Sequence, residues 1–169
     1  SPVEHAPRPH RDADPDSGCG LERGSQTGPS GKAMGIFLKN PTLREPGLTL
    51  TGKIAARTGA RLYAPTSNVR IDRGARRVSV ERVPYLLELA MERLSDLEHM
   101  IGFGDAEPVA FFACHNKPSR ILQDGCIVQR LATEDENGTK ALEMLVTAIS
   151  AHNETPSVSE LREPELPTG

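Results

Sequence analysis

The sequence predicts an α/β fold, with helices on both faces of a mostly parallel sheet of five or six strands. Apolar runs typical of strands alternate with amphipathic stretches typical of helices, in the order β-α-β, loop, α-β-β-β-α. Residues 99–103 and 109–114 are apolar without alternation, as in strands covered on both faces, so Phe111 and Phe112 should point to opposite faces. Together these observations indicate a three-layer, Rossmann-like domain.

The first half of the pattern is a β-α-β unit, whose crossover should be right-handed. Residues 33–39 form its first predicted strand, and residues 60–64 form its second. Residues 43–58 are predicted to be the helix between them, with Pro46 in the first turn. Gly59 follows the last helical residue, where a glycine commonly adopts the left-handed cap.

A long polar connection, residues 65–83, follows this unit. Its arginines are interpreted as a solvated basic loop: Arg70, Arg73, Arg76, Arg77 and Arg82. Pro84 is predicted to begin the next helix, at the first position that proline favours. The apolar residues of this helix recur at helical spacing and predict its buried face: Leu86, Leu89, Ala90, Leu94 and Leu97.

The last two elements of the pattern are a strand and a helix. Residues 126–131 predict the strand, and residues 138–152 predict the helix. Either Asp135 or Asn137 can cap the first turn of this helix. Its predicted buried face consists of four residues at helical spacing: Leu142, Leu145, Val146 and Ile149.

The composition divides the chain into one domain and two tails. Residues 1–32 are rich in Pro, Gly, Ser, Asp and Arg and are predicted to be a disordered arm or linker. Residues 33–152 contain the Leu, Ile, Val and Ala that a buried core requires. Residues 153–169 return to Pro, Ser and Glu and are interpreted as a second linker.

Charge and cysteine content limit the partners and the compartment. The net charge of −3 gives no electrostatic footprint for nucleic acid. The three cysteines show no disulfide framework, and Cys114 and Cys126 should be buried thiols in strands. The first residues, SPVEHAPRPH, have no apolar core region and are not expected to be a signal peptide, and no apolar run approaches the roughly 20 residues that span a membrane. We therefore expect a cytoplasmic protein with neither a nucleic-acid nor a membrane partner.

Three long segments resemble a known family. They read GIFLKNPTLREPGLTLTGKIAARTGARLYAPT, RVPYLLELAMERLSDLEHMIGFGDAEPVAFFACHNKPS and GCIVQRLATEDENGTKALEMLVTAI. They look like the middle (central) domain of thiamine-diphosphate-dependent enzymes, close to acetolactate synthase large-subunit-like and benzoylformate decarboxylase-like proteins. The resemblance ends at LPTG, residues 166–169, which looks like the start of the family's next domain.

This resemblance implies a structural role. Residues 33–152 would be a DHS-like central domain, and residues 153–169 a linker toward a C-terminal catalytic domain. The flanking catalytic domains would be its partners in a homo-oligomeric transferase or lyase. Those domains would hold thiamine diphosphate and magnesium for decarboxylation or carboligation of 2-keto acids. The isolated chain is expected to be inactive, with no catalytic residue, metal or cofactor of its own.

Two other functions are open. The first is a free-standing, Rossmann-like module that binds a nucleotide or FAD. It is considered because true acetolactate synthases hold FAD in the middle domain. No G-x-G-x-x-G follows the first strand, which argues against that module. The second is a complete Rossmann-like enzyme, such as a sirtuin-like deacylase or a dehydrogenase. The sequence argues against such an enzyme, because it places no catalytic histidine and no zinc-binding set of cysteines.

If a ligand binds, it should lie where the strand order reverses, at the carboxyl ends of the strands. We expect the strand at 33–39 to lie between those at 60–64 and 99–103. The candidate cofactor-binding residues at this point are Lys39, Asn40, Gly102, Phe103, Gly104 and Asp105. The glycines would let a ligand approach the backbone, and Lys39 could meet an anion. Without a glycine turn into the first helix, we expect weak binding of FAD or a nucleotide.

Other motifs predict little chemistry. Residues 104–106, Gly-Asp-Ala, resemble the Gly-Asp-Gly with which the family's catalytic domain holds magnesium, and Asn137 lies downstream. Ala106 lacks the freedom of a glycine, so a polar turn is the favoured interpretation. Ser119 has no evident base. The histidines considered as ligands have no metal-binding spacing: His99, His115 and His152.

Overall fold

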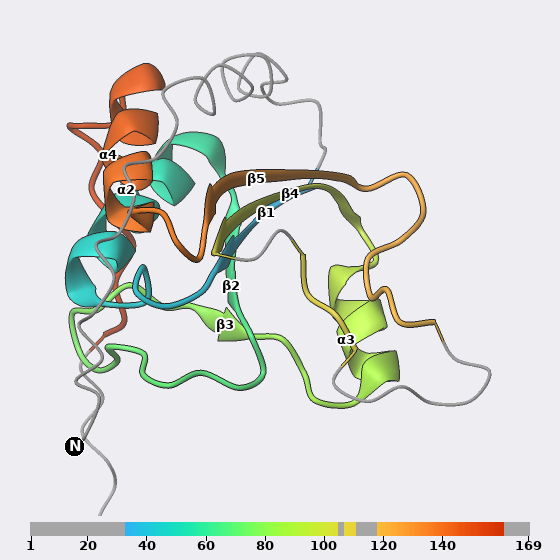
Figure 1. Cartoon of the computed structure of the whole chain (residues 1–169). Helices are drawn as coiled ribbons and strands as arrows, with labels where there is room; N and C mark the ends of the chain where they lie inside the picture. The colour runs from blue at the N-terminus through green and yellow to red at the C-terminus, as the bar shows by residue number, and fades with distance from the viewer. Residues whose placement is uncertain (1–32, 105–106, 111–117, 161–169) are drawn as a thin grey trace, which may run out of the picture.

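The computed structural model describes residues 33–104, 107–110 and 118–160 and contains a five-stranded, all-parallel sheet (Figure 1). The strand order is β3-β2-β1-β4-β5, which confirms the predicted α/β class. The strands are β1 (Ala33–Leu38), β2 (Arg61–Ala64), β3 (Glu81–Arg82), β4 (Leu97–Gly104) and β5 (Ile127–Thr133). The predicted N-terminal arm, Cys114 and the LPTG segment lie outside the described residues.

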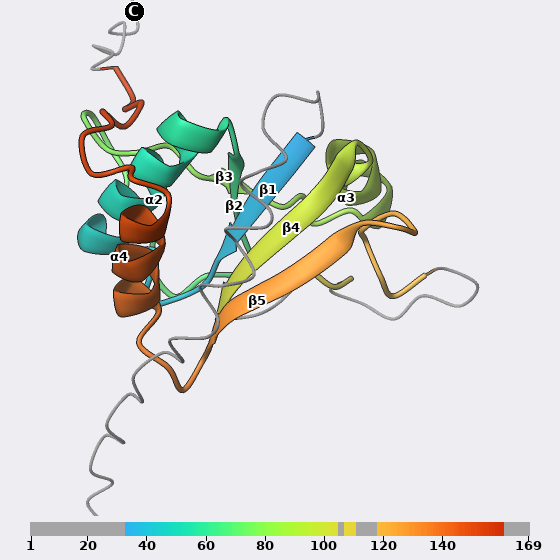
Figure 2. The ribbon, with the colours of Figure 1, turned by 90° about the horizontal axis from the view of Figure 1, so that it is seen from above.

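Three helices in the described part cover the two faces of the sheet. They are α2 (Glu45–Thr58), α3 (Leu87–Leu94) and α4 (Gly138–Ala148). Helices α2 and α4 lie side by side on one face, and α3 lies on the other (Figure 2). Successive residues of β1 therefore enter different cores: Ile36 packs toward α2 and α4, and Phe37 packs toward α3. None of the helices in the described ranges is long and apolar enough to cross a membrane.

The predicted β-α-β unit is present, and its helix ends as expected. Helix α2 begins at Glu45 with Pro46 in its first turn, and β1 pairs with β2 in parallel. Gly59 has a φ of 75°, and its N–H donates to the carbonyl oxygen of Ala55 at 2.8 Å. This left-handed cap is the one that the sequence predicts.

Helix α4 confirms the predicted cap and buried face. The Oδ1 atom of Asn137 accepts a hydrogen bond from the N–H of Lys140 at 3.1 Å, so Asn137 and not Asp135 caps the helix. All four residues predicted for its buried face are buried: Leu142, Leu145, Val146 and Ile149. The helix is shorter than predicted, since it ends at Ala148 rather than at residue 152.

The connection between β2 and α3 differs from the prediction. Two of its residues form the edge strand β3, in register with Tyr63 and Ala64. The N–H of Val83 also bonds to the carbonyl oxygen of Ala64 at 2.9 Å, so the chain stays extended beyond β3. Helix α3 therefore begins at Leu87, not at Pro84. The predicted buried residues Leu86 and Leu89 are 57% and 50% exposed, although Leu89 lies within the helix.

The prediction of a buried central strand at 109–114 is wrong at its first residue. Val109 is 69% exposed and forms only an isolated antiparallel bridge with Arg120. The place beside β4 is taken by β5 instead. Phe111 and Phe112 lie outside the described residues.

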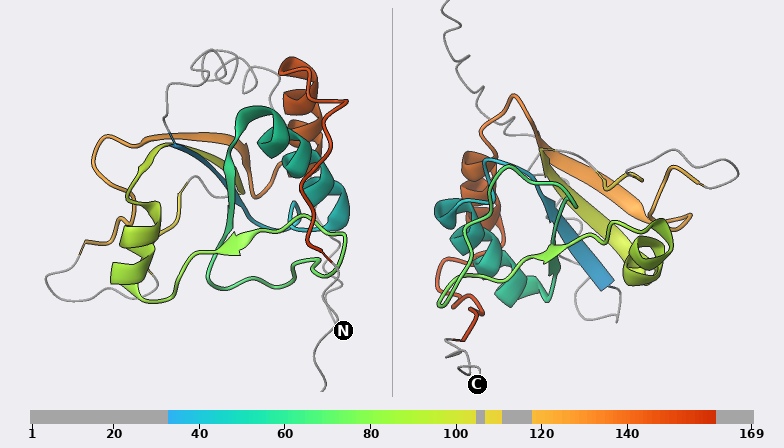
Figure 3. Two further views of the ribbon diagram at one scale, coloured as in Figure 1. Left: turned by 180° about the vertical axis from the view of Figure 1, so that it is seen from behind. Right: turned by 90° about the horizontal axis from the view of Figure 1, so that it is seen from below.

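Residues 152–160, here called the return segment, run back along α2 (Figure 3). The carbonyl oxygen of His152 accepts a hydrogen bond from Nζ of Lys53 at 2.8 Å. Val158 forms an antiparallel bridge with Val78, which lies in the connection after β2. The first part of the predicted second linker is therefore packed against the domain.

We predict that Gly47→Ala destabilises the domain. A Cβ atom at Gly47 would lie 2.3 Å from the carbonyl oxygen of Thr42, which is a backbone atom and cannot rotate away. This clash should outweigh the preference of helices for alanine and cost about 1–3 kcal/mol of unfolding free energy.

Chemical denaturation of the variant would measure the loss. Thr49→Ala, at an exposed position of the same helix, is the matched control and should change the unfolding free energy by less than about 0.5 kcal/mol. Equal stability of Gly47→Ala and wild type would contradict the close packing of α2 on the turn before it.

Candidate functional site

The switch point of the sheet lies between β1 and β4, as predicted. The chain adds β2 and β3 on one side of β1 and then crosses to add β4 and β5 on the other. In register, Leu38 pairs with Phe103, and the N–H of Lys39 donates to the carbonyl oxygen of Phe103 at 3.0 Å. Two backbone segments that carry candidate ligand contacts thus meet at this edge.

The candidate residues have different surroundings there. Lys39 and Asn40 lead into the turn before α2, and Gly104 ends β4. Gly102 is buried within β4, and the Phe103 side chain is fully buried in the core beneath α2 and α4. Asp105 lies outside the described residues. Whether any of these residues binds a cofactor stays a prediction.

The Lys39 side chain fills the space at the end of β4. Its ammonium group forms an ion pair with the carboxylate of Glu134, from the turn after β5, and so passes across the end of β4. Gly104 has a φ of 96°, and a Cβ atom there would lie 2.8 Å from Cβ of Lys39. The absence of a side chain at Gly104 thus makes room for Lys39, and the charge of Lys39 is already balanced by a carboxylate.

The start of α2 is held by side chains from two directions. Thr42 is buried, and its Oγ1 donates to the carbonyl oxygen of Lys39 at 2.6 Å. Asp72, from the connection after β2, accepts a hydrogen bond from the N–H of Glu45 at 2.9 Å. Arg44 occupies the N-cap position and makes no side-chain cap of its own. Asp72 therefore does the work of a capping residue from a distant part of the chain.

Asp72 was not predicted from the sequence, although one signal pointed to it. Helix α2 carries an arginine where Ser, Thr, Asp or Asn is favoured, which indicates that some other group meets its first N–H donors. The arginines of the basic loop are largely exposed, as the prediction of a solvated loop requires, and two of them also form ion pairs. Arg70 lies 3.6 Å from the Asp72 carboxylate, and Arg77 pairs with Glu45.

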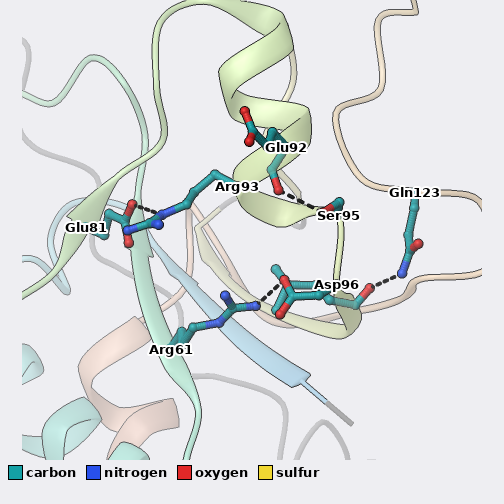
Figure 4. Close-up of polar contacts among 8 residues, drawn as sticks. Arg61, Glu81, Glu92, Arg93, Ser95, Asp96 and Gln123 are labelled. Atoms are coloured by element: carbon teal, nitrogen blue, oxygen red, sulfur yellow. Dashed lines mark hydrogen bonds and ion pairs between the residues drawn. The ribbon is translucent and has the colours of Figure 1, made fainter.

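A second polar cluster lies at the opposite, amino-terminal edge of the sheet (Figure 4). Arg61 pairs with Asp96 at 2.6 Å, and Arg93 of α3 pairs with Glu81 of β3. Nε2 of Gln123 donates to the carbonyl oxygen of Leu97 at 2.9 Å. The Arg93–Glu81 pair joins α3 to β3, the Arg61–Asp96 pair joins β2 to the turn after α3, and Gln123 holds the first residue of β4. The opposite charges are paired with one another. The cluster contains no nucleophile held by a base, which is the arrangement that covalent catalysis needs.

Two buried groups next to these networks are held in their neutral forms. Burial raises the pKa of the Tyr63 hydroxyl, and its oxygen has no hydrogen-bond partner among the described residues. Burial likewise raises the pKa of the Cys126 thiol, which disfavours the reactive thiolate. In the ranges that the structure describes, no group of three or more His, Cys, Asp or Glu side chains could hold a metal ion.

Two known proteins are similar to this chain, although no family model matches it. The Mycobacterium tuberculosis (strain H37Rv) protein IlvX, which carries the name of an acetolactate synthase large subunit, is 34% identical over 140 residues, or 83% of this chain. The thiamine diphosphate-dependent 4-hydroxybenzoylformate decarboxylase of Rhodococcus jostii RHA1 matches 98% of the chain with a TM-score of 0.59 and 14% identity, which shows a shared fold.

These matches confirm the predicted resemblance to thiamine-diphosphate-dependent enzymes. They also show a difference in length, because this chain spans 27% of IlvX and 33% of the decarboxylase chain. The similarity therefore concerns one part of each larger protein.

We predict that Asp96→Asn weakens the dependence of stability on acid pH. The hydrogen bond from Arg61 holds the pKa of the Asp96 carboxyl below its usual value. A carboxyl with a lowered folded pKa stabilises the folded chain above its unfolded pKa of about 4, and this stabilisation is lost as the pH falls through the folded pKa. Because the pair is exposed, the contribution should be below about 1 kcal/mol.

Thermal denaturation at several pH values, in low and high salt, would measure this contribution. Asp135→Asn, at an exposed aspartate in the turn before α4, is the control. Relative to wild type, Asp96→Asn should lose stability above about pH 4, and this difference should shrink as the pH falls further, whereas Asp135→Asn should follow the wild-type profile. Identical pH profiles for Asp96→Asn and wild type would contradict the role of the Arg61–Asp96 pair.

Proposed function

We propose that this chain is the structural central domain of a thiamine-diphosphate-dependent, acetolactate-synthase-like enzyme and is inactive alone. The observation that carries this proposal is the unequal coverage in the sequence match. The match extends over 83% of this chain but only 27% of IlvX. A domain of this kind would be one unit of a longer polypeptide whose other domains hold thiamine diphosphate and magnesium.

The described residues support a bracing role rather than a chemical one. Both faces of the sheet are covered, and the core on each side is closed by helices or loops. The polar clusters at the two edges of the sheet consist of paired charges and capping contacts. We infer that such a unit fixes the distance and orientation of flanking catalytic domains, which would act on a 2-keto acid in a homo-oligomeric enzyme.

The alternative, a free-standing module that binds FAD or a nucleotide, has less support. A dinucleotide in this fold class places its diphosphate at the start of the helix after β1, near the switch point. In this chain, Asp72 and Glu45 bring carboxylates to that helix start, and Lys39 is paired with Glu134. The residues present therefore do not fit a dinucleotide.

We predict that the pure chain does not consume pyruvate in a reaction that depends on thiamine diphosphate and Mg²⁺. The physical reason is that the described residues supply no group of carboxylates for the metal, and the helix start at the switch point is already capped by Asp72. Release of carbon dioxide would be measured with and without the cofactor, and the Rhodococcus decarboxylase with its own substrate would serve as the positive control.

Turnover that requires thiamine diphosphate would overturn the proposal. A second test examines the transcript that encodes this domain. The central-domain role requires reading frames for two further α/β domains, one on each side, within the same polypeptide or complex. An operon that encodes this domain with no such neighbours would contradict that role.

A further inference from the structure

We propose that the Asp72 carboxylate is a built-in anion, which takes the place that a ligand phosphate holds in nucleotide-binding members of this fold class. In such folds the phosphate accepts hydrogen bonds from the first N–H groups of the helix after β1. Here that helix is α2, and the N–H of Glu45 donates to Oδ2 of Asp72 at 2.9 Å. The proposal deepens the structural role proposed above, because it explains how the fold does without a dinucleotide.

The charges around Asp72 match those of a phosphate site. The guanidinium groups of Arg44 and Arg70 lie 3.4 Å and 3.6 Å from its Oδ1. The carboxylate also lies at the positive end of the α2 dipole, where an anion is stabilised. One negative group thus meets a backbone donor, two arginines and a helix start.

Two further positions of the first turn offer no donor to an external ligand. Pro46 has no N–H, and the N–H of Leu48 bonds to the carbonyl oxygen of Arg44 at 2.9 Å. The space beside Gly47, which a ligand could use in a glycine turn, is filled by the backbone of Thr42. A diphosphate would have to displace Asp72 and would also meet the Glu45 carboxylate.

The loop that carries Asp72 is fastened at both ends. On one side, the N–H of Asp72 donates to the carbonyl oxygen of Leu43 at 3.1 Å. On the other side, the backbone of Arg76 and Arg77 exchanges two hydrogen bonds with Ser159 of the return segment, at 2.9 Å and 2.8 Å. The carboxylate is therefore held in position before any ligand arrives, which is the condition for it to act as a permanent cap.

FAD is a candidate ligand because of the resemblance to acetolactate synthases, but it does not fit this arrangement. Its diphosphate would carry negative charge to a helix start that already holds one carboxylate by a hydrogen bond and another in an ion pair. We infer that internal capping has replaced the dinucleotide, so that the domain needs no cofactor to hold α2 in place.

The test removes the built-in anion and asks whether an external one replaces it. Asp72→Ala should lower Tm by about 2–8 °C, as expected for the loss of a helix cap in a domain of this size. Inorganic phosphate, compared with sodium chloride at equal ionic strength, should then raise the Tm of Asp72→Ala more than that of wild type. Asp135→Ala, which removes an exposed aspartate elsewhere, should respond to phosphate as wild type does.

A second variant keeps the test informative if Asp72→Ala does not fold. In Asp72→Asn a side-chain oxygen can still accept from Glu45, but the negative charge is lost. Its Tm should fall by less than that of Asp72→Ala, and its response to phosphate should still exceed that of wild type. Equal phosphate responses of both Asp72 variants and wild type would overturn the proposal.

A titration of the wild-type chain with FAD and ADP completes the experiment. Following the amide signals of residues 39–48 and 72 by NMR, we expect no saturable shift in wild type at micromolar ligand. Submicromolar FAD binding at these amides would overturn the proposal. None of these measurements involves catalysis, so turnover by the pure chain would contradict the proposed function and leave the role of Asp72 standing.

Discussion

The pairing of β1 on both of its edges is the constraint on which the rest of the structure depends. This strand bonds in parallel to β2 and to β4, and its alternate side chains enter both cores. Because parallel strands need crossovers, placing β1 in the middle forces helices onto both faces. The same placement creates the switch point at the carboxyl end of β1, so the position of any ligand site follows from the sheet topology.

Elements that depend on local sequence could be predicted, and those that depend on distant contacts could not. The Gly59 cap and the Asn137 cap are set by neighbouring residues; the sequence predicted the first and gave Asn137 as one of two candidates for the second. Strand β3 has two residues in a polar stretch and exists because β2 offers an edge to pair with. The continued pairing at Val83 then delays α3, although Pro84 has the local signature of a helix start.

The candidate site shows the same difference between features set by predictable elements and features set by distant contacts. Its location came from the predicted strand order, since Lys39 follows β1 and Gly104 ends β4, and these two strands are neighbours in the sheet. The groups that fill the site could not be predicted in this way. Glu134 follows β5, and Asp72 lies in a connection without regular structure. The arginine at the N-cap position indicates that a distant acceptor is needed, but the sequence placed the helix start at residue 43 and not at Glu45.

The return segment shows how backbone contacts can hold a polar stretch against the domain. Residues 153–160 are mostly polar and contain one proline, and a linker is the natural prediction for such a composition. The return segment is held mainly through its backbone, which bonds to Lys53 and pairs with residues 76–78. Backbone pairing does not require apolar side chains, so hydropathy cannot detect it. The segment also bonds to the loop that caps α2, so its backbone contacts reach the surroundings of the first helix.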